Sequence, residues 1–535
     1  MGVIYAGAGA CQSAGRFCSS PFTLGYGFAA LMTRPHRSSA PIFEGLAVVY
    51  PSADADRPAL SALPAIPAHV AWPLIVAALM LVMLLALGGK LLNDADTYWQ
   101  IALGDWMIAN RAVPHVDTFS WTVAGAPWIS SQWLAQVIFA VSYGALGWSG
   151  VVAASALAIA SAFGLLTYYL MRHLAPVPAL VLTMAGFVLA APHMVARPHA
   201  LALPVMVLWV AGLVRAVDDR RAPSFWLLPL IALWANLHGG FTFGLFLIAL
   251  VAFEALINAD AGDRLRVVTR WALFGVGALV AACITPYGPE SILVTRRILG
   301  LGPALALIGE WQPQDFARLG GFELVLLGAI GFLLYRRITL PPVRILVVLG
   351  VLHMALSQSR NGEMLGLVAP LFIAAPLAPQ LGRRAINDAK ALYTVAAAAL
   401  LLLAMVMSIV LPLSLRYEPR AEVSPAGAVA AVKASGRTHL LNSYDFGGYL
   451  IAQGVRPFID GRTELYGADF FLRHDAAVNL KNIGAFHDLM RDRNIDVTLL
   501  APSAPAVGLL DRMPEWKRVY ADDNAVVHVR TNVAR

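Results

Sequence analysis

The chain of 535 residues has little charge and little cysteine. Only 13% of its residues are Asp, Glu, Lys or Arg, whereas 59% are hydrophobic. A soluble protein of this composition would need a core far larger than one domain buries. The three cysteines, Cys11, Cys18 and Cys283, lack metal-ligand spacing. We expect no disulfide, since the first two are expected in the cytoplasm, where thiols stay reduced.

The sequence contains many long apolar runs. Runs of about twenty residues recur along the sequence, and a helix of that length crosses the roughly 30 Å hydrocarbon core of a bilayer. We therefore predict an all-α polytopic membrane bundle of about 11 transmembrane helices. The predicted spans are 71–89, 150–171, 176–192, 199–214, 225–238, 240–257, 271–287, 321–335, 345–358, 364–380 and 391–414.

The basic residues predict the orientation, because positive charges in short loops resist translocation. With a cytoplasmic N-terminus, the cytoplasmic loops hold Arg172, Arg215, Arg220, Arg221, Arg264, Arg266, Arg270, Arg336, Arg337, Arg344, Arg383, Arg384 and Lys390. The longer outer loops hold only Lys90, Arg111, Arg197, Arg296, Arg297, Arg318 and Arg360. We predict a multi-pass protein of the bacterial inner membrane. The net charge of +7 is spread over these loops, so we expect membrane lipids and no nucleic acid as partners.

The composition divides the chain into three parts. Residues 1–69 are predicted to be a disordered cytoplasmic tail, or in part the result of a start codon assigned too early. Residues 70–415 form the predicted membrane domain, whose first outer loop, 91–149, includes an amphipathic surface helix from Trp133 to Gly147. Residues 416–535 are predicted to be a small extracytoplasmic α/β domain, with strands at 438–441, 449–451, 496–500 and 525–530.

One segment of this last domain, Asn442 to Gly467, is rich in glycine, aromatic and charged residues, as a surface recognition loop would be. Its charged residues are interpreted as surface ion pairs: Asp445, Arg456, Asp460, Arg462 and Glu464.

The unusual polar residues of the bundle fall on its predicted outer side. Ionisable groups at a membrane boundary cost free energy unless they are paired or hydrated, so this one-sided distribution indicates a functional site. The candidates are Asp94, Asp96, His193, Arg197, His199, Asn236, His238, Tyr287, Glu310, Gln312, Asp315, Arg360, Asn361 and Glu363.

Asp94 and Asp96 follow the first predicted span directly. An Asp-x-Asp pair holds a divalent cation such as Mg²⁺ or Mn²⁺, or supplies a general base. The alternative is that Asp94 caps a helix over 97–109 while Asp96 is solvated. Nearby tryptophans, Trp99, Trp121 and Trp128 among them, suit sugar faces or an interfacial belt equally.

Other candidates suit substrate binding. Arg197 with His193 and His199, or Arg360 with Asn361, could hold a phosphate, although a single boundary arginine also extends to lipid headgroups. His238 precedes Gly239–Gly240, where a broken span lines a cavity or simply turns. Glu310 could assist a metal ion or position an acceptor.

The Asp94-Ala-Asp96 motif, the long first outer loop and the Pro127-Trp128 and Trp133-Leu134 pairs before the second span resemble the GT-C superfamily of membrane glycosyltransferases. The pattern is similar to that of bacterial aminoarabinose and mannose transferases and covers residues 70–415. The resemblance implies a sugar passed with inversion from a polyprenyl-phosphate carrier to an extracytoplasmic glycan, lipid or protein acceptor. It also implies that Asp96 or Asp94 is the catalytic base or a metal ligand.

The rival interpretation is a non-catalytic membrane scaffold or a transporter in envelope glycan assembly. Transporters carry internal repeats and polar residues near mid-span. The spans show no such symmetry and hold few charges apart from Glu254 and His353, so a glycosyltransferase is favoured.

Overall fold

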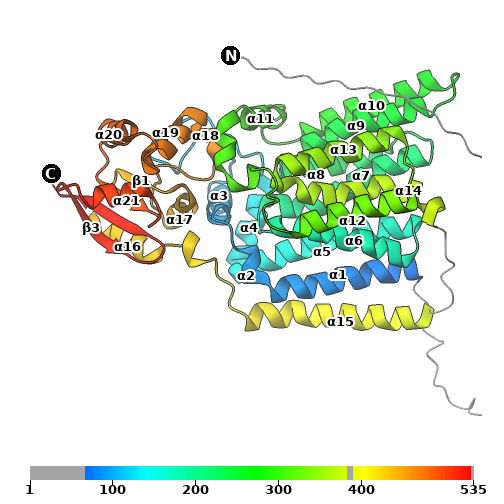
Figure 1. Ribbon diagram of the computed structural model, residues 1–535, viewed down its shortest axis with the longest axis horizontal. Helices are drawn as coiled ribbons and strands as arrows, with labels where there is room; N and C mark the ends of the chain where they lie inside the picture. The colour runs from blue at the N-terminus through cyan, green and yellow to red at the C-terminus, as the bar shows by residue number, and fades with distance from the viewer. Residues whose placement is uncertain (1–66, 382–389, 532–535) are drawn as a thin grey trace, which may run out of the picture. The chain divides into compact units, whose positions relative to one another are not determined.

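The structure, a computed structural model, describes residues 67–381 and 390–531 (Figure 1). Most of the predicted N-terminal tail lies outside the described residues. The helices of the membrane domain are α1 Ala68–Ala86, α2 Gly88–Leu91, α3 Asp96–Asn110, α4 Trp133–Leu146, α5 Trp148–His173, α6 Pro176–Ala190, α7 Pro198–Asp218, α8 Leu228–Leu237, α9 Phe241–Ile257, α10 Arg264–Ala282, α11 Glu290–Leu299, α12 Gly321–Arg336, α13 Pro342–Ser357, α14 Gly362–Leu381 and α15 Lys390–Ser414.

A helix occupies each of the eleven predicted spans, and the chain is a multi-pass membrane protein. Within the described residues, seven helical segments have the length and apolar composition to cross a bilayer: Ala68–Ala86, Trp148–His173, Pro176–His193, Pro198–Asp218, Arg264–Ala282, Ser359–Leu381 and Thr394–Ser414. The helices at the other four predicted spans, α8, α9, α12 and α13, are shorter. The count of eleven spans therefore stays a prediction.

Small residues allow the long helices to pack closely. A Cβ atom on Gly186 of α6 would lie 2.3 Å from the carbonyl oxygen of Gly366 in α14, so these two helices cross backbone to backbone.

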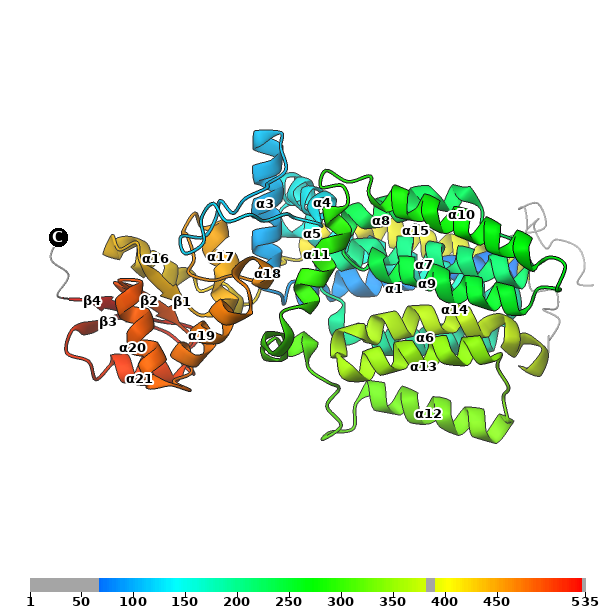
Figure 2. The ribbon, with the colours of Figure 1, turned by 90° about the horizontal axis from the view of Figure 1, so that it is seen from above.

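Two short helices, α3 and α4, lie apart from the set of long helices. Figure 2 shows α3 standing at a steep angle to the long helices, and α4 packs against α3 and α5. The predicted place of α4 on the membrane surface stays a prediction.

Arg344 joins four membrane helices through a buried cluster of polar contacts. Arg344 of α13 is only 3% exposed, and its Nε lies 2.7 Å from Glu254 Oε1 of α9. Its other nitrogens donate to Asp218 at the end of α7 and to the Phe372 carbonyl of α14, the latter at 3.0 Å. The interpretation of Arg344 as a loop charge is therefore wrong, because this arginine neutralises carboxylates inside the bundle.

Replacing Arg344 with methionine is expected to destabilise the protein by about 3–5 kcal/mol, since it leaves the buried Glu254 and the half-buried Asp218 without a cation. The unfolding temperature in detergent measures the effect. Arg264→Met removes an exposed arginine of α10 and is the matched control, with a change expected near zero. Equal unfolding temperatures for the two variants would contradict a stabilising cluster.

The C-terminal residues form a four-stranded sheet with helices around it. The strands are β1 Leu440–Asn442, β2 Val497–Leu500, β3 Trp516–Ala521 and β4 Val526–Arg530, and the helices are α16 Ala426–Ser435, α17 Gly447–Ala452, α18 Thr463–Tyr466, α19 Ala468–Val478, α20 Ile483–Asp492 and α21 Pro505–Leu510. The sheet order is β1-β2-β4-β3. β1 is parallel to β2, with Leu441 opposite Thr498, and the other pairs are antiparallel.

One predicted strand is wrong. Residues 449–451 lie in helix α17, which packs against α3. A Cβ atom on Gly448 would lie 2.2 Å from the Ala95 carbonyl oxygen, and one on Gly447 would lie 2.4 Å from that of Ile459. The two glycines therefore let the helix approach two backbones closely, a tertiary contact that outweighs the local β-propensity of Tyr and Ile.

Candidate functional site

The aspartate pair lies at the turn that starts α3. Asp96 is the first residue of the helix, and its backbone N–H donates to Asp94 Oδ1 at 2.8 Å. Thr97 Oγ1 donates to the Ala196 carbonyl at 3.0 Å, and the Ala196 N–H donates to the Leu91 carbonyl at 2.7 Å. These hydrogen bonds hold the chain just before α7 against the aspartate turn.

Arg197 therefore reaches three carboxylates with one guanidinium group. Its Nε lies 2.6 Å from Asp94 Oδ2, and its Nη2 donates to Asp96 Oδ2 at 2.6 Å. Its Nη1 donates to Glu310 Oε2. The side chain of Arg197 is 19% exposed, so these pairs are better shielded from solvent than a surface salt bridge.

Glu310 joins Arg197 to a second arginine. Arg360 Nη1 donates to Glu310 Oε1 at 2.9 Å, and the Arg360 guanidinium carbon lies 4.6 Å from the Trp311 ring centroid. Ser359, beside Arg360, donates from its hydroxyl to the Glu310 carbonyl. We call Asp94, Asp96, Arg197, Glu310 and Arg360 the charged cluster. It carries three negative and two positive formal charges, and a carboxylate lies between its two cations.

Two acids of the charged cluster, Asp96 and Glu310, have opposite pKa shifts. Burial raises the pKa of Asp96 to about 7; the nearby Arg197 opposes that rise, while Asp94 adds to it. Burial also disfavours ionised Glu310, but Arg197 and Arg360 outweigh it and lower the pKa of Glu310 to about 2. Near neutral pH, Asp96 is therefore suited to exchange a proton, while Glu310 stays ionised.

The C-terminal domain completes the surroundings of Asp96. Trp99 Nε1 donates to Asp96 Oδ1 at 3.0 Å, and a Cβ atom on Gly461 would lie only 1.8 Å from that oxygen. Burial and the nearby Asp96 raise the pKa of Tyr444, and burial and Asp94 raise that of Asp445. Sequence reasoning missed these contacts. The glycine-rich composition of 442–467 was the signal that could have indicated them.

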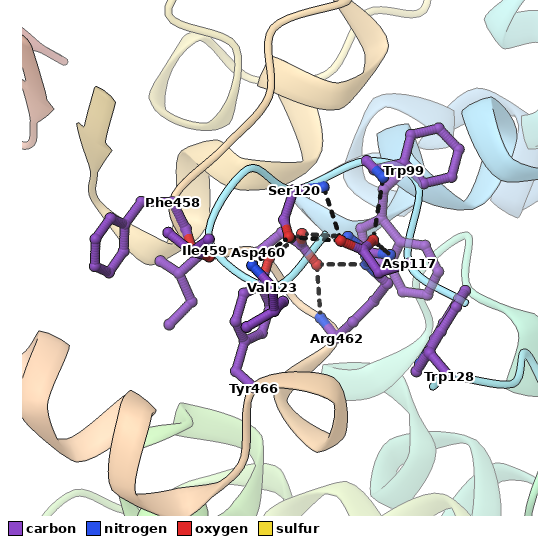
Figure 3. Close-up of polar contacts among 12 residues, drawn as sticks. Trp99, Asp117, Ser120, Val123, Trp128, Phe458, Ile459, Asp460, Arg462 and Tyr466 are labelled. Atoms are coloured by element: carbon purple, nitrogen blue, oxygen red, sulfur yellow. Dashed lines mark hydrogen bonds and ion pairs between the residues drawn. The ribbon is translucent and has the colours of Figure 1, made fainter. Parts of the chain in front are cut away.

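A buried ion cluster fastens the same segment to the first outer loop (Figure 3). Arg462 is 1% exposed; its Nη2 lies 2.7 Å from Asp460 Oδ2 and its Nη1 lies 2.6 Å from Asp117 Oδ1. Tyr466 donates to Asp460 Oδ2 at 2.6 Å. The interpretation of Asp460 and Arg462 as surface ion pairs is therefore wrong, because the outer loop covers them.

The tryptophans of the first outer loop join the two domains. Trp121 Nε1 donates to the Leu440 carbonyl and Trp128 Nε1 donates to Glu464 Oε1, each at 3.0 Å. The Arg462 guanidinium carbon lies 4.9 Å from the centroid of the Trp128 ring. These two indoles pack within the protein, which neither the sugar-binding nor the interfacial-belt interpretation anticipated.

The predicted histidines gather beside the charged cluster. His199 Nε2 lies 3.5 Å from Glu363 Oε2 and 3.1 Å from the His193 carbonyl oxygen. The His238 ring lies 6.0 Å from that of His199, and its Nδ1 accepts from the Gly240 N–H, which closes the turn. Asn361 donates to the Met354 carbonyl of α13 and to Gln358.

Three further candidates have hydrogen-bond partners outside the charged cluster. Asn236 accepts from Trp133 Nε1 at 2.6 Å, and the Tyr287 hydroxyl donates to the Pro114 carbonyl at 3.0 Å. Asp315 accepts from the Ala317 N–H in its own loop.

The three carboxylates of the charged cluster are all directed at one arginine. Asp94, Asp96 and Glu310 each direct an oxygen at Arg197, so the guanidinium occupies the position at which a cation would be shared. No three His, Cys, Asp or Glu side chains in residues 67–381 and 390–531 form a group that could hold a metal ion. The predicted divalent cation stays a prediction.

The fold has counterparts among solved structures. The archaeal oligosaccharyltransferase AglB from Archaeoglobus fulgidus, solved with an inhibitory peptide and a dolichol-phosphate, aligns with a TM-score of 0.52 at 12% identity, over 81% of this chain and 69% of that one. ArnT from Cupriavidus metallidurans, bound to undecaprenyl phosphate, aligns at 15% identity over 84% and 97%. Its TM-score of 0.44 is too low to extend the comparison. No protein-family model and no curated protein sequence matches the chain.

Proposed function

We propose that this chain is an inverting glycosyltransferase of the bacterial inner membrane. It has the fold of the GT-C membrane glycosyltransferases, which its sequence also resembles. It moves a sugar from a polyprenyl-phosphate carrier to a glycan, lipid or protein acceptor on the extracytoplasmic side. The dolichol-phosphate bound by AglB supports a lipid-linked donor. The predicted topology, with a cytoplasmic N-terminus and a periplasmic C-terminal domain, belongs to this proposal.

The charged cluster is the observation that carries the proposal. A transferase of this kind needs a base for its acceptor and cations for the phosphate of its donor. Asp96 and the two arginines, Arg197 and Arg360, meet both needs in one place. Glu310 occupies the position between the arginines that a phosphate would take, so donor binding displaces its carboxylate.

The reaction then follows from these residues. The acceptor gives its proton to Asp96 and attacks the anomeric carbon from the face opposite the phosphate. The bond between that carbon and the phosphate oxygen breaks, and the polyprenyl phosphate leaves with the electron pair and the charge that Arg197 and Arg360 stabilise. Binding of the donor phosphate draws Arg197 away from Asp96 Oδ2, while Trp99 holds Oδ1. Asp94 holds the turn that positions the base.

The pH dependence tests the role of Asp96. Its pKa is raised to about 7, and a base acts only when ionised, so kcat/KM is expected to rise through about pH 7 and to level off above it. Glu310→Gln removes a negative charge that raises this pKa, so the rise is expected at lower pH in that variant. Glu290→Gln, which alters an exposed carboxylate of α11, is the control. Identical profiles for all three proteins would contradict this role.

Turnover distinguishes the enzyme from the scaffold or transporter. Purified protein in nanodiscs is incubated with radiolabelled polyprenyl-phosphate sugars and extracted envelope glycans or lipids. The proposal predicts release of polyprenyl phosphate and label in a new product of inverted configuration. Binding of the donors without release of polyprenyl phosphate would favour a scaffold.

A further inference from the structure

A hollow lies at the opposite end of α7 from the charged cluster. The helix begins next to Arg197 and ends at Asp218, and its 21 residues span about 31 Å, close to the thickness of a bilayer core. At the Asp218 end, the residues after α7 and the turn between α9 and α10 enclose a cavity of about 230 Å³.

The walls of this cavity are basic. Its lining includes four arginines and two aspartates: Arg220, Arg221, Arg266, Arg270, Asp260 and Asp263. Arg221 lies 3.0 Å from Asp219 and Arg266 lies 2.9 Å from Asp263. Across the part of the chain that the structure describes, neither Arg220 nor Arg270 forms an ion pair. Two guanidinium groups are therefore available to an anion from solvent or membrane.

An apolar groove adjoins the cavity at Trp271. It has a volume of about 470 Å³ and lies between α9 and α10, which pack side by side (Figure 1). Its lining is apolar throughout and includes Leu245, Ile248 and Gly275. Trp271, which is 3% exposed, lines both the cavity and the groove. The two hollows thus meet at one side chain.

We propose that this composite site binds one anionic phospholipid, with its phosphate at Arg220 and Arg270 and one acyl chain in the groove. A guanidinium fork binds two phosphate oxygens, and basic pockets at the ends of membrane helices select anionic headgroups. Arginines that serve only to orient the chain would need no groove beside them. A basic cavity and an apolar groove that both border Trp271 match a molecule that has an anionic head and an apolar tail.

Native mass spectrometry of the purified full-length chain tests the proposal. The probes are dioleoylphosphatidylglycerol and, as the zwitterionic comparison, dioleoylphosphatidylcholine. The wild type is expected to retain phosphatidylglycerol preferentially. Arg220→Gln with Arg270→Gln is expected to weaken that binding roughly 30-fold, from the contribution of each basic residue near an anionic surface. Arg336→Gln with Arg337→Gln removes two charges at the end of α12 and is expected to leave binding unchanged.

A second variant tests the groove. Gly275→Phe fills it, and because a Cβ atom there would approach only Ile248, at 3.8 Å, the helix has room for the change. Phosphatidylglycerol binding is expected to fall in this variant and to persist in Gly331→Phe, its control on α12. Unfolding temperatures verify that all variants are folded. Equal retention of the two lipids by the wild type, or undiminished phosphatidylglycerol binding in the double arginine variant, would overturn the proposal.

Discussion

Asp96→Asn is expected to lower sugar transfer by about 10²- to 10⁴-fold, the range that a positioned general base contributes. The substitution keeps the shape of the side chain, and its amide oxygen can still accept from Trp99 Nε1, the present partner of Asp96 Oδ1. It removes the capacity to take a proton and the negative charge that pairs with Arg197 Nη2. The measurement is kcat with a labelled polyprenyl-phosphate sugar, together with the abundance of the variant in the membrane.

The matched control for this variant is Asp105→Asn, on the same helix α3. Asp105 is exposed and lies outside the charged cluster, so its replacement is expected to leave kcat within about twofold, as surface substitutions are usually neutral. Normal product formation by Asp96→Asn at normal abundance would reject Asp96 as the base.

Arg197→Gln is expected to weaken donor binding by about 10- to 100-fold, because a hydrogen bond to a charged group contributes about 1.5–3 kcal/mol. The same change leaves Asp94, Asp96 and Glu310 without their shared cation, so it also disfavours ionised Asp96. Arg197→Lys keeps the charge but lacks the three guanidinium nitrogens that contact the three carboxylates. An affinity for the donor between those of the wild type and Arg197→Gln is expected. Binding of a polyprenyl phosphate to the purified variants measures the effect.

Arg215→Gln is the control at the other end of the same helix. Arg215 is half exposed and pairs only with Asp219 among the described residues, and its removal is expected to leave donor binding unchanged. The double variant Arg197→Gln, Glu310→Gln removes one charge of each sign, so it leaves the net charge of the cluster unchanged. A loss of donor binding in this variant therefore reports on binding and not on folding. Donor affinity that stays at the wild-type level in Arg197→Gln would refute the phosphate-binding role.

Hydropathy and charge predicted the helices and the one-sided set of polar residues, since both are local properties of the chain. The contacts within that set could not be predicted. Asp94 and Arg197 are a hundred positions apart in sequence, and their proximity depends on hydrogen bonds from Thr97 and Ala196 that leave no local pattern. The residue type of Arg197 and its place on the predicted outer side indicate phosphate binding. That Arg197 bridges three carboxylates is evident only in three dimensions.

Burial by a distant part of the chain accounts for the errors. The sequence places Arg344 in a loop just before a predicted span, but Glu254 and Asp218 hold it inside the bundle. Arg462 is a charged residue in a polar segment, as surface residues usually are, but the first outer loop covers it and supplies Asp117. In both cases the partner comes from a segment far away in sequence, so no window of local sequence contains the reason for burial.

The most direct test is a structure of the protein in nanodiscs with a bound polyprenyl phosphate. We expect the phosphate between Arg197 and Arg360, with the Glu310 carboxylate displaced and Asp96 facing the position of the anomeric carbon. A phosphate bound elsewhere, while Arg197 still joins Asp94, Asp96 and Glu310, would contradict it.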